Sequence, residues 1–176
     1  MAIPNALSLL RIALVPIVVA LLLVSFPYHA WWAAGLFLVA SLTDVLDGRI
    51  ARSRGDVTVF GTFIDSLADK LLIVSVLIAL VEMDRVSAWV AIIVVAREFA
   101  VTGLRLIAAQ DEVIAASRFG KAKMVLQVVA VVALMLNTQW PEVNLILVLA
   151  MLAATIASGV DYFVNGWRHL TAGVTR

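Results

Sequence analysis

Six long apolar segments, separated by short polar stretches, organise this sequence. Each is close to the ~20 residues that an α-helix needs to cross the hydrocarbon core of a bilayer. We predict spanning helices over residues 6–25, 31–52, 60–82, 86–108, 121–139 and 143–165. Proline, glycine or clustered charges mark the breaks between them. The pattern predicts an all-α integral membrane protein with six transmembrane helices, built as a single domain over residues 1–176.

The composition supports a membrane protein. Of the 176 residues, 64% are hydrophobic and 14% are charged, and the mean hydropathy is +1.07. A soluble domain is close to half apolar and a quarter charged. The first apolar run, residues 7–25, is longer than the core of a signal peptide, so we expect it to be retained as a helix. The chain has no cysteine, which excludes disulfides and thiolate metal sites.

The basic residues predict the orientation of the helices, because cytoplasmic loops of membrane proteins are enriched in lysine and arginine. With six spans, both termini and the second and fourth loops lie on one side. That side and its helix ends hold Arg11, Arg49, Arg52, Arg54, Arg118, Lys121, Lys123, Arg168 and Arg176. The opposite side holds only Arg85. We therefore predict that both termini are cytoplasmic.

Four carboxylates lie at the predicted cytoplasmic ends of the second and third spans: Asp44, Asp47, Asp65 and Asp69. A carboxylate at the middle of a spanning helix costs about 2.5–3.5 kcal/mol on insertion scales, so four without partners would cost roughly 10–14 kcal/mol. Spacings of three and four residues place each pair on one helix face. Two helices joined by a short loop lie antiparallel and adjacent, so the two acidic faces can meet.

This arrangement favours a divalent metal site. Ligand sets made only of oxygen select hard cations such as Mg²⁺ or Mn²⁺ over zinc. Four carboxylates can hold two ions about 3.5–4 Å apart, which clamp the attacking and leaving oxygens in phosphoryl transfer. Gly48, Ala51 and Gly61 continue the acidic faces and leave room for a bulky ligand near the backbone. The alternative is that these aspartates lie at solvated helix ends and form ion pairs with neighbouring basic residues. It explains each aspartate taken alone, but not four acids at helical spacing with small residues between them.

The pattern Asp-x₂-Asp-Gly-x₂-Ala-Arg-x₈-Gly-x₃-Asp-x₃-Asp, over residues 44–69, resembles the signature of the CDP-alcohol phosphotransferases at every fixed position. A chance match of all fixed positions is on the order of 10⁻¹⁰ per window. The resemblance implies a six-helix domain of the bacterial inner membrane that commonly forms a homodimer. It implies transfer of a phosphatidyl group from a CDP-linked lipid to an alcohol, with release of CMP. No nucleic-acid partner is expected.

The resemblance also implies roles for individual residues. Two divalent ions, Mg²⁺ or Mn²⁺, would be held against the substrate diphosphate by Asp44, Asp47, Asp65 and Asp69. The last of the four, Asp69, would also be the general base. The residues along the nucleotide would be Gly48, Ala51, Arg52 and Gly61.

A second cluster of basic residues indicates an acceptor that carries phosphate. Arginine binds phosphate through bidentate hydrogen bonds, and lysine adds a point charge. An arginine within a membrane span is a functional candidate by default. We predict that the acceptor phosphate is bound by Arg97, Arg105 and Lys121, with Arg118 and Lys123 as further candidates. The alternatives are an ion pair between Arg97 and Glu98 or an aspartate, and membrane anchoring by the two lysines.

The identity of the acceptor follows from resemblance to one branch of the family. The run Arg97-Glu98…Gly103-Leu-Arg105, followed by Ser-Arg-x-Gly-Lys-x-Lys at 117–123, resembles the branch whose acceptor is sn-glycerol 3-phosphate. It implies CDP-diacylglycerol as the donor and phosphatidylglycerophosphate as the product. Inositol phosphate as the acceptor, a divalent-cation carrier and a lipid-binding structural subunit stay open as alternatives.

Overall fold

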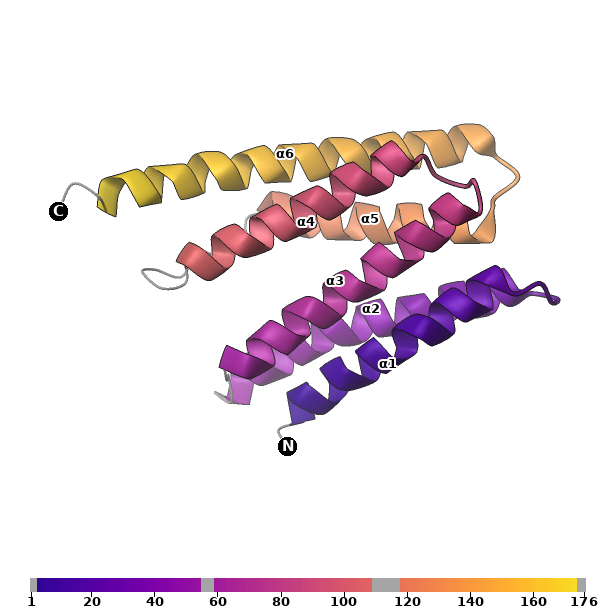
Figure 1. The fold of residues 1–176 in the computed structure, drawn as a ribbon, viewed down its shortest axis with the longest axis horizontal. Helices are drawn as coiled ribbons and strands as arrows, with labels where there is room; N and C mark the ends of the chain where they lie inside the picture. Colours follow the sequence, from indigo (N-terminus) through magenta and orange to yellow (C-terminus); the bar gives the residue numbers. More distant parts are fainter. Residues whose placement is uncertain (1–2, 55–58, 109–117, 174–176) are drawn as a thin grey trace. The chain divides into compact units, whose positions relative to one another are not determined.

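The computed structural model describes the backbone of residues 3–54, 59–108 and 118–173, and the side chains of 8–43, 64, 67–104 and 122–164. Over these residues all regular structure is helical and there is no strand, which confirms the all-α class (Figure 1). The helices are α1 (Ile3–Leu23), α2 (His29–Arg54), α3 (Val59–Glu82), α4 (Ala88–Ala108), α5 (Arg118–Leu136) and α6 (Pro141–Gly173). Their ends lie close to the predicted ones, except that α6 ends at residue 173 rather than 165.

Three short turns between helices have a left-handed backbone residue: two follow the end of a helix, and one directly precedes α2. Each contains a residue with positive φ: Tyr28 (64°), Asp84 (56°) and Asn137 (46°). After α3, the Arg85 N–H donates to the Leu80 carbonyl (2.9 Å) and the Asp84 N–H to the Val81 carbonyl (3.0 Å). This pair of bonds is a Schellman motif, with Asp84 in the left-handed position. Asn137 ends α5 in a similar conformation, which is why this helix stops before the predicted residue 139.

The first compact unit comprises α1, α2, α3 and residues 131–138. Within it α1 packs against both α2 and α3, which contact each other over a smaller described surface. α2 runs antiparallel to α1 and α3, so its C-terminal end lies beside the starts of the other two helices (Figure 1). Apolar side chains such as Val18, Phe37 and Val76 are fully buried in this unit. The unit therefore brings the acid-bearing ends of α2 and α3 to one end of the three-helix group.

Arg85 ties the α3–α4 turn to the C-terminal end of α5, within the same unit. Its Nη1 donates to the carbonyl of Met135 (2.6 Å) and more weakly to that of Leu134 (3.3 Å). A basic side chain at a helix C-terminus satisfies carbonyls left free there and complements the helix dipole. Burial lowers the pKa of the Arg85 guanidinium from its ordinary value, and an arginine still remains protonated at neutral pH. This cap gives a structural reason for the single basic residue on the predicted outer side.

The second compact unit comprises α4, residues 118–130 of α5, and α6. α6 buries a stripe that includes Met151, Thr155 and Ser158, while Leu145 and Ile146 on its exposed side are 59% and 64% accessible. Small and polar residues inside, with large apolar residues outside, is the pattern of a helix that faces lipid.

Residues 141–164 of α6 form the one helix, of those the structure describes, that is long and apolar enough to cross a membrane. Only 22% of its most apolar stretch is buried, unlike the core helix of a soluble protein. Shorter apolar helical stretches occur over residues 8–23, 29–43 and 122–136. The six-span topology and the single domain therefore stay predictions.

Candidate active site

The acid motif lies on two helices of the first unit. Asp44 and Asp47 belong to α2, and Asp65 and Asp69 belong to α3. The side chains of most predicted metal and nucleotide ligands lie outside the described residues: Asp44, Asp47, Gly48, Ala51, Arg52, Gly61 and Asp65. Their assignments therefore stay predictions. The structure shows how the acid positions of α2 and α3 are spaced relative to the buried residues of the same helices.

On α2, the acid positions continue the buried face of the helix. Ala33, Phe37 and Ala40 are 0–1% exposed and follow one another at spacings of four and three residues. Positions 44 and 47 follow Ala40 at four and seven residues, which returns to the same stripe of an α-helix. The acid positions of α2 are therefore on the same helix face as the buried apolar residues that precede them.

α3 shows the same register from its opposite end. Leu72 and Val76 are buried, at 2% and 0% exposure, and Asp69 precedes them by three and seven residues. Asp65 lies four residues, about one turn, before Asp69 on this stripe. The side chain of Asp69 is partly buried. Positions 65 and 69 are therefore in register with the buried stripe of α3.

The first helix adds a basic residue that the sequence analysis used only to set orientation. Arg11 is 1% exposed and shares its buried stripe on α1 with Ser8 and Val18. Since α1 packs on both α2 and α3, a guanidinium is buried in the unit that carries the acid motif. The spacing of Ser8, Arg11 and Val18 at three and seven residues was the signal that could have placed Arg11 inside.

The donor chemistry of the acid motif fits divalent ions. Carboxylate oxygens are the preferred ligands of Mg²⁺ and Mn²⁺, and the motif offers no nitrogen or sulfur ligand. Of the four acids only Asp69 has a described side chain, and the side chains that the structure describes form no group of three or more metal-binding residues. The fit of the motif to divalent ions therefore depends on its carboxylate ligands and on the spacing of the acid positions along α2 and α3.

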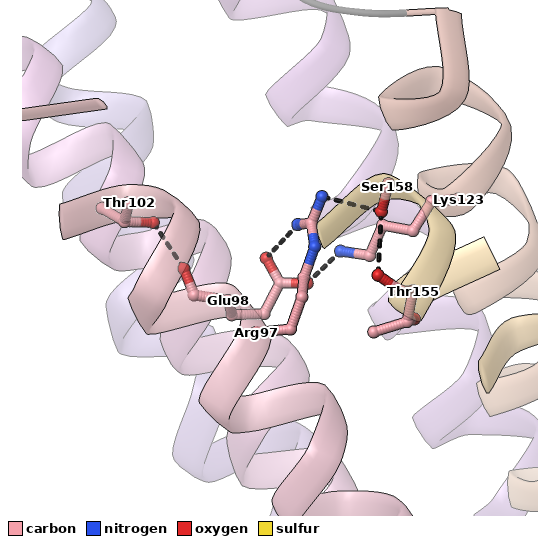
Figure 2. Close-up of polar contacts among 6 residues, drawn as sticks. All are labelled: Arg97, Glu98, Thr102, Lys123, Thr155 and Ser158. Atoms are coloured by element: carbon pink, nitrogen blue, oxygen red, sulfur yellow. Dashed lines mark hydrogen bonds and ion pairs between the residues drawn. The ribbon is translucent and has the colours of Figure 1, made fainter. Parts of the chain in front are cut away.

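A charged cluster joins the three helices of the second unit (Figure 2). From α4, Arg97 Nη2 donates to Ser158 Oγ of α6 (2.9 Å), and Arg97 Nη1 lies 3.4 Å from Glu98 Oε2. From α5, Lys123 Nζ donates to Glu98 Oε1. Ser158 Oγ in turn donates to the backbone carbonyl of Thr155 (3.1 Å). One carboxylate therefore holds two basic side chains, and α6 holds one of them by a second bond.

Burial makes this cluster energetically important. Glu98 and Lys123 are 7% and 6% exposed. Removing one partner of such a buried pair leaves an uncompensated charge and costs about 3–5 kcal/mol. The predicted alternative of an Arg97–Glu98 ion pair is thus present in the structure. The side chain of Lys123 is likewise buried against the carboxylate of Glu98.

Two polar atoms of the cluster remain without a hydrogen bond in the described part of the chain. They are Arg97 Nε and Thr155 Oγ1, and both are buried. Leaving a buried donor unsatisfied costs about 1–3 kcal/mol, so such atoms need a physical reason. Gly159 lies against the same arginine, since a Cβ on it would be 3.4 Å from Arg97 Cγ. Arg105, Arg118 and Lys121 have side chains outside the described residues.

The contribution of α6 to the charged cluster was not predicted from the sequence. Ser158 and Gly159 follow Thr155 at three and four residues, which places small and polar residues on one stripe of an apolar helix. That stripe was the available signal, since small and polar residues within a span mark helix contacts.

Comparison with known proteins decides the family. The model of the CDP-alcohol phosphatidyltransferase family matches residues 1–160. The chain belongs to this family. The match includes the acid motif of α2 and α3 and the charged cluster of α4, α5 and α6. Enzymes of the CDP-alcohol phosphatidyltransferase family use divalent metal ions and are membrane-embedded proteins of lipid biosynthesis.

Several relatives match over most of their own length. A Bacillus subtilis protein named "CDP-diacylglycerol--glycerol-3-phosphate 3-phosphatidyltransferase" is 42% identical, over 95% of this chain and 96% of the relative. A Mycobacterium tuberculosis protein named "Probable phosphatidylglycerophosphate synthase" is 37% identical, over 94% of this chain and 82% of the relative. A Rickettsia bellii protein with the same name as the Bacillus relative is 36% identical, over 91% of this chain and 92% of its own.

Proposed function

We propose that this protein transfers the phosphatidyl group of CDP-diacylglycerol to sn-glycerol 3-phosphate, giving phosphatidylglycerophosphate and CMP. The observation that carries the proposal is the complete acid motif over residues 44–69, whose four acid positions fall within the helices α2 and α3. The names of relatives that are 36–42% identical over most of the chain support the same donor and acceptor.

In this proposal the acid motif holds the donor. Its four aspartates bind two divalent ions, Mg²⁺ or Mn²⁺. When bound, such ions neutralise the charge of the diphosphate and of the CMP that leaves. The residues along the nucleotide are Gly48, Ala51, Arg52 and Gly61. The small residues among them let the nucleotide approach the helix backbone closely.

The reaction is a displacement at phosphorus. The acceptor hydroxyl oxygen bonds to the phosphorus that carries diacylglycerol, and the bond from that phosphorus to the bridging oxygen breaks. CMP leaves with the bonding electron pair. The proton of the hydroxyl moves to the carboxylate of Asp69, which acts as general base. The partial burial of Asp69, on the core-facing stripe of α3, suits a base that works away from bulk water.

The charged cluster of the second unit supports an acceptor that carries a phosphate. In the proposal the acceptor phosphate is bound by Arg97, Arg105 and Lys121, together with Arg118 and Lys123. Arg97 supports this role directly, because its Nε remains a buried donor without a hydrogen bond among the described residues. An acceptor without a phosphate group, such as serine, would leave these buried donors without a charged acceptor for their hydrogen bonds.

We further propose that all six helices span the inner membrane and that both termini and the acid motif face the cytoplasm, in a homodimer. Four exposed tryptophans flank the turns predicted on the opposite face: Trp31, Trp32, Trp89 and Trp140, at 65–74% exposure. Tryptophans gather at the membrane interface. Because the chain has no cysteine, single cysteines can test this. A cysteine replacing Asp84 should react from outside intact cells, and one replacing Gly55 should not; the reverse pattern would invert the topology.

A panel of acceptors tests the proposed reaction. Purified protein in detergent micelles would receive CDP-diacylglycerol with sn-glycerol 3-phosphate, inositol phosphate or serine, and CMP release would be measured. We expect release with sn-glycerol 3-phosphate to exceed the others by about 100-fold or more, because a polar site rejects ligands that leave its buried donors unpaired. EDTA should abolish the release, and Mg²⁺ or Mn²⁺ should restore it.

The alternatives give different results in the same panel. Faster release with inositol phosphate would overturn the choice of acceptor and keep the chemistry. Absence of CMP release with every acceptor, together with divalent-cation flux into vesicles that contain the protein, would support a carrier instead.

A further inference from the structure

We infer that Glu98 is a positioning residue, which holds Arg97 and Lys123 together as the pair that binds the acceptor phosphate. The inference rests on the proposed function and deepens it. Glu98 itself does not touch the substrate in this account. It acts through the two basic side chains, while Ser158 of α6 supplies a second support for one of them.

The geometry of Glu98 suits such a role. Its Oε1 accepts from Lys123 of α5, and its Oε2 lies 3.4 Å from Arg97 Nη1 (Figure 2). Its own backbone carbonyl accepts from Thr102 Oγ1 at 2.7 Å. A carboxylate that uses both oxygens on two cations fixes the separation between them. Glu98 therefore determines where the two positive groups lie relative to each other.

Arg97 needs more than one support. Neighbouring residues on a helix do not face each other, so the arginine must bend back to reach Glu98. The bond from Arg97 Nη2 to Ser158 Oγ, at 2.9 Å, fixes the other side of the guanidinium. Ser158 is itself oriented by its bond to the carbonyl of Thr155. Gly159 lies beside the arginine stem, since a Cβ there would be 3.4 Å from Arg97 Cγ, within ordinary van der Waals contact.

The atoms that remain indicate what the pair is positioned for. With both Nη atoms bound, Arg97 still has Nε buried and without a hydrogen bond in the described part of the chain, and Thr155 Oγ1 is in the same state. Both can donate to a phosphate oxygen. Figure 2 shows Arg97 and Lys123 on the same carboxylate, so both positive groups lie beside these two atoms. A purely structural ion pair would need neither the second cation nor the free donors.

The variant Glu98→Gln tests the inference, because it keeps the shape and removes the charge. We expect the KM for sn-glycerol 3-phosphate to rise about 10-fold or more, since loosening both cations weakens a charge-assisted site. The KM for CDP-diacylglycerol should stay within about twofold, because the acid motif is unchanged. Glu142→Gln, at an exposed glutamate of α6, is the matched control and should leave both constants unchanged. If Glu98→Gln left both KM values unchanged, or raised both alike, the inference would be overturned.

Ser158→Ala provides a second variant if Glu98→Gln does not fold. It removes one hydroxyl from α6 and should raise the KM for sn-glycerol 3-phosphate about threefold to tenfold, the size expected for one lost hydrogen bond to a charged group. An unchanged KM in Ser158→Ala would count against the inference in the same way.

Binding of inorganic phosphate separates this inference from the proposed function. With EDTA present to remove metals, phosphate should raise the melting temperature of the wild-type protein and should do so much less for Glu98→Gln or Ser158→Ala. If the wild type released no CMP but showed this difference, the proposed function would fail and the role of Glu98 would stand. Equal phosphate responses in wild type and variants would overturn the role of Glu98 even in an active enzyme.

Discussion

Replacing Asp69 with asparagine is expected to abolish CMP release and leave the fold intact. The change removes a carboxylate that the account uses both as a metal ligand and as the general base. General-base catalysis alone contributes about 10²–10⁴-fold, so we expect kcat to fall by at least about 10³-fold. CMP release from CDP-diacylglycerol, with sn-glycerol 3-phosphate as the acceptor, measures the effect. Circular dichroism and elution from a sizing column measure the fold.

The control for this variant is the same substitution at a surface turn. Asp84 is exposed and has a φ of 56°, a conformation that asparagine also adopts readily. Asp84→Asn should therefore keep full activity. A variant Asp69→Asn that retains more than about a tenth of the wild-type kcat would contradict the role of this carboxylate in the chemistry.

The second large effect is expected from replacing Arg97 with lysine. An ammonium group keeps the charge and loses the planar fork, so it cannot hold Ser158 and Glu98 while it donates to a phosphate. We expect kcat/KM for sn-glycerol 3-phosphate to fall about 100-fold, which corresponds to ~2.7 kcal/mol of transition-state stabilisation. The KM for CDP-diacylglycerol should change little. Steady-state kinetics with each substrate varied in turn measures both effects.

Arg85→Lys is the matched control, because Arg85 has a purely structural role here. It caps α5 through two backbone carbonyls, so the lysine should lower the melting temperature and leave both KM values unchanged. If the two lysine variants changed the kinetics alike, or if Arg97→Lys raised both KM values equally, Arg97 would not belong to the acceptor site.

The helices could be predicted from sequence because their signals are local. Apolar stretches of spanning length, bounded by charges, proline or glycine, predicted a helix over 60–82 where the structure has Val59–Glu82. The C-terminal end of α6 was predicted wrongly, at 165 instead of 173. A hydropathy pattern marks only the apolar stretch, so it does not detect a helix that continues with polar residues such as Arg168 and His169.

The acid motif was also visible from sequence, since spacings of three and four residues translate directly into one helix face. The charged cluster was only half visible. Arg97 was recognised because an arginine within a span is unusual. Ser158 and Thr155 are ordinary residues whose importance depends on which helices pack together, and one sequence does not show that. The burial of Lys123 against Glu98 was not predicted for the same reason, because the buried side of α5 depends on its neighbours.

The central claim is that carboxylates from α2 and α3 together hold two divalent ions on the donor diphosphate. Electron paramagnetic resonance of the protein loaded with Mn²⁺, in the presence of CDP-diacylglycerol and without an acceptor, tests it most directly. The account predicts two Mn²⁺ ions per chain that are close enough to couple magnetically, and loss of the coupled signal in Asp65→Asn. A spectrum of isolated Mn²⁺ ions, or a coupled signal that persists in Asp65→Asn, would contradict it.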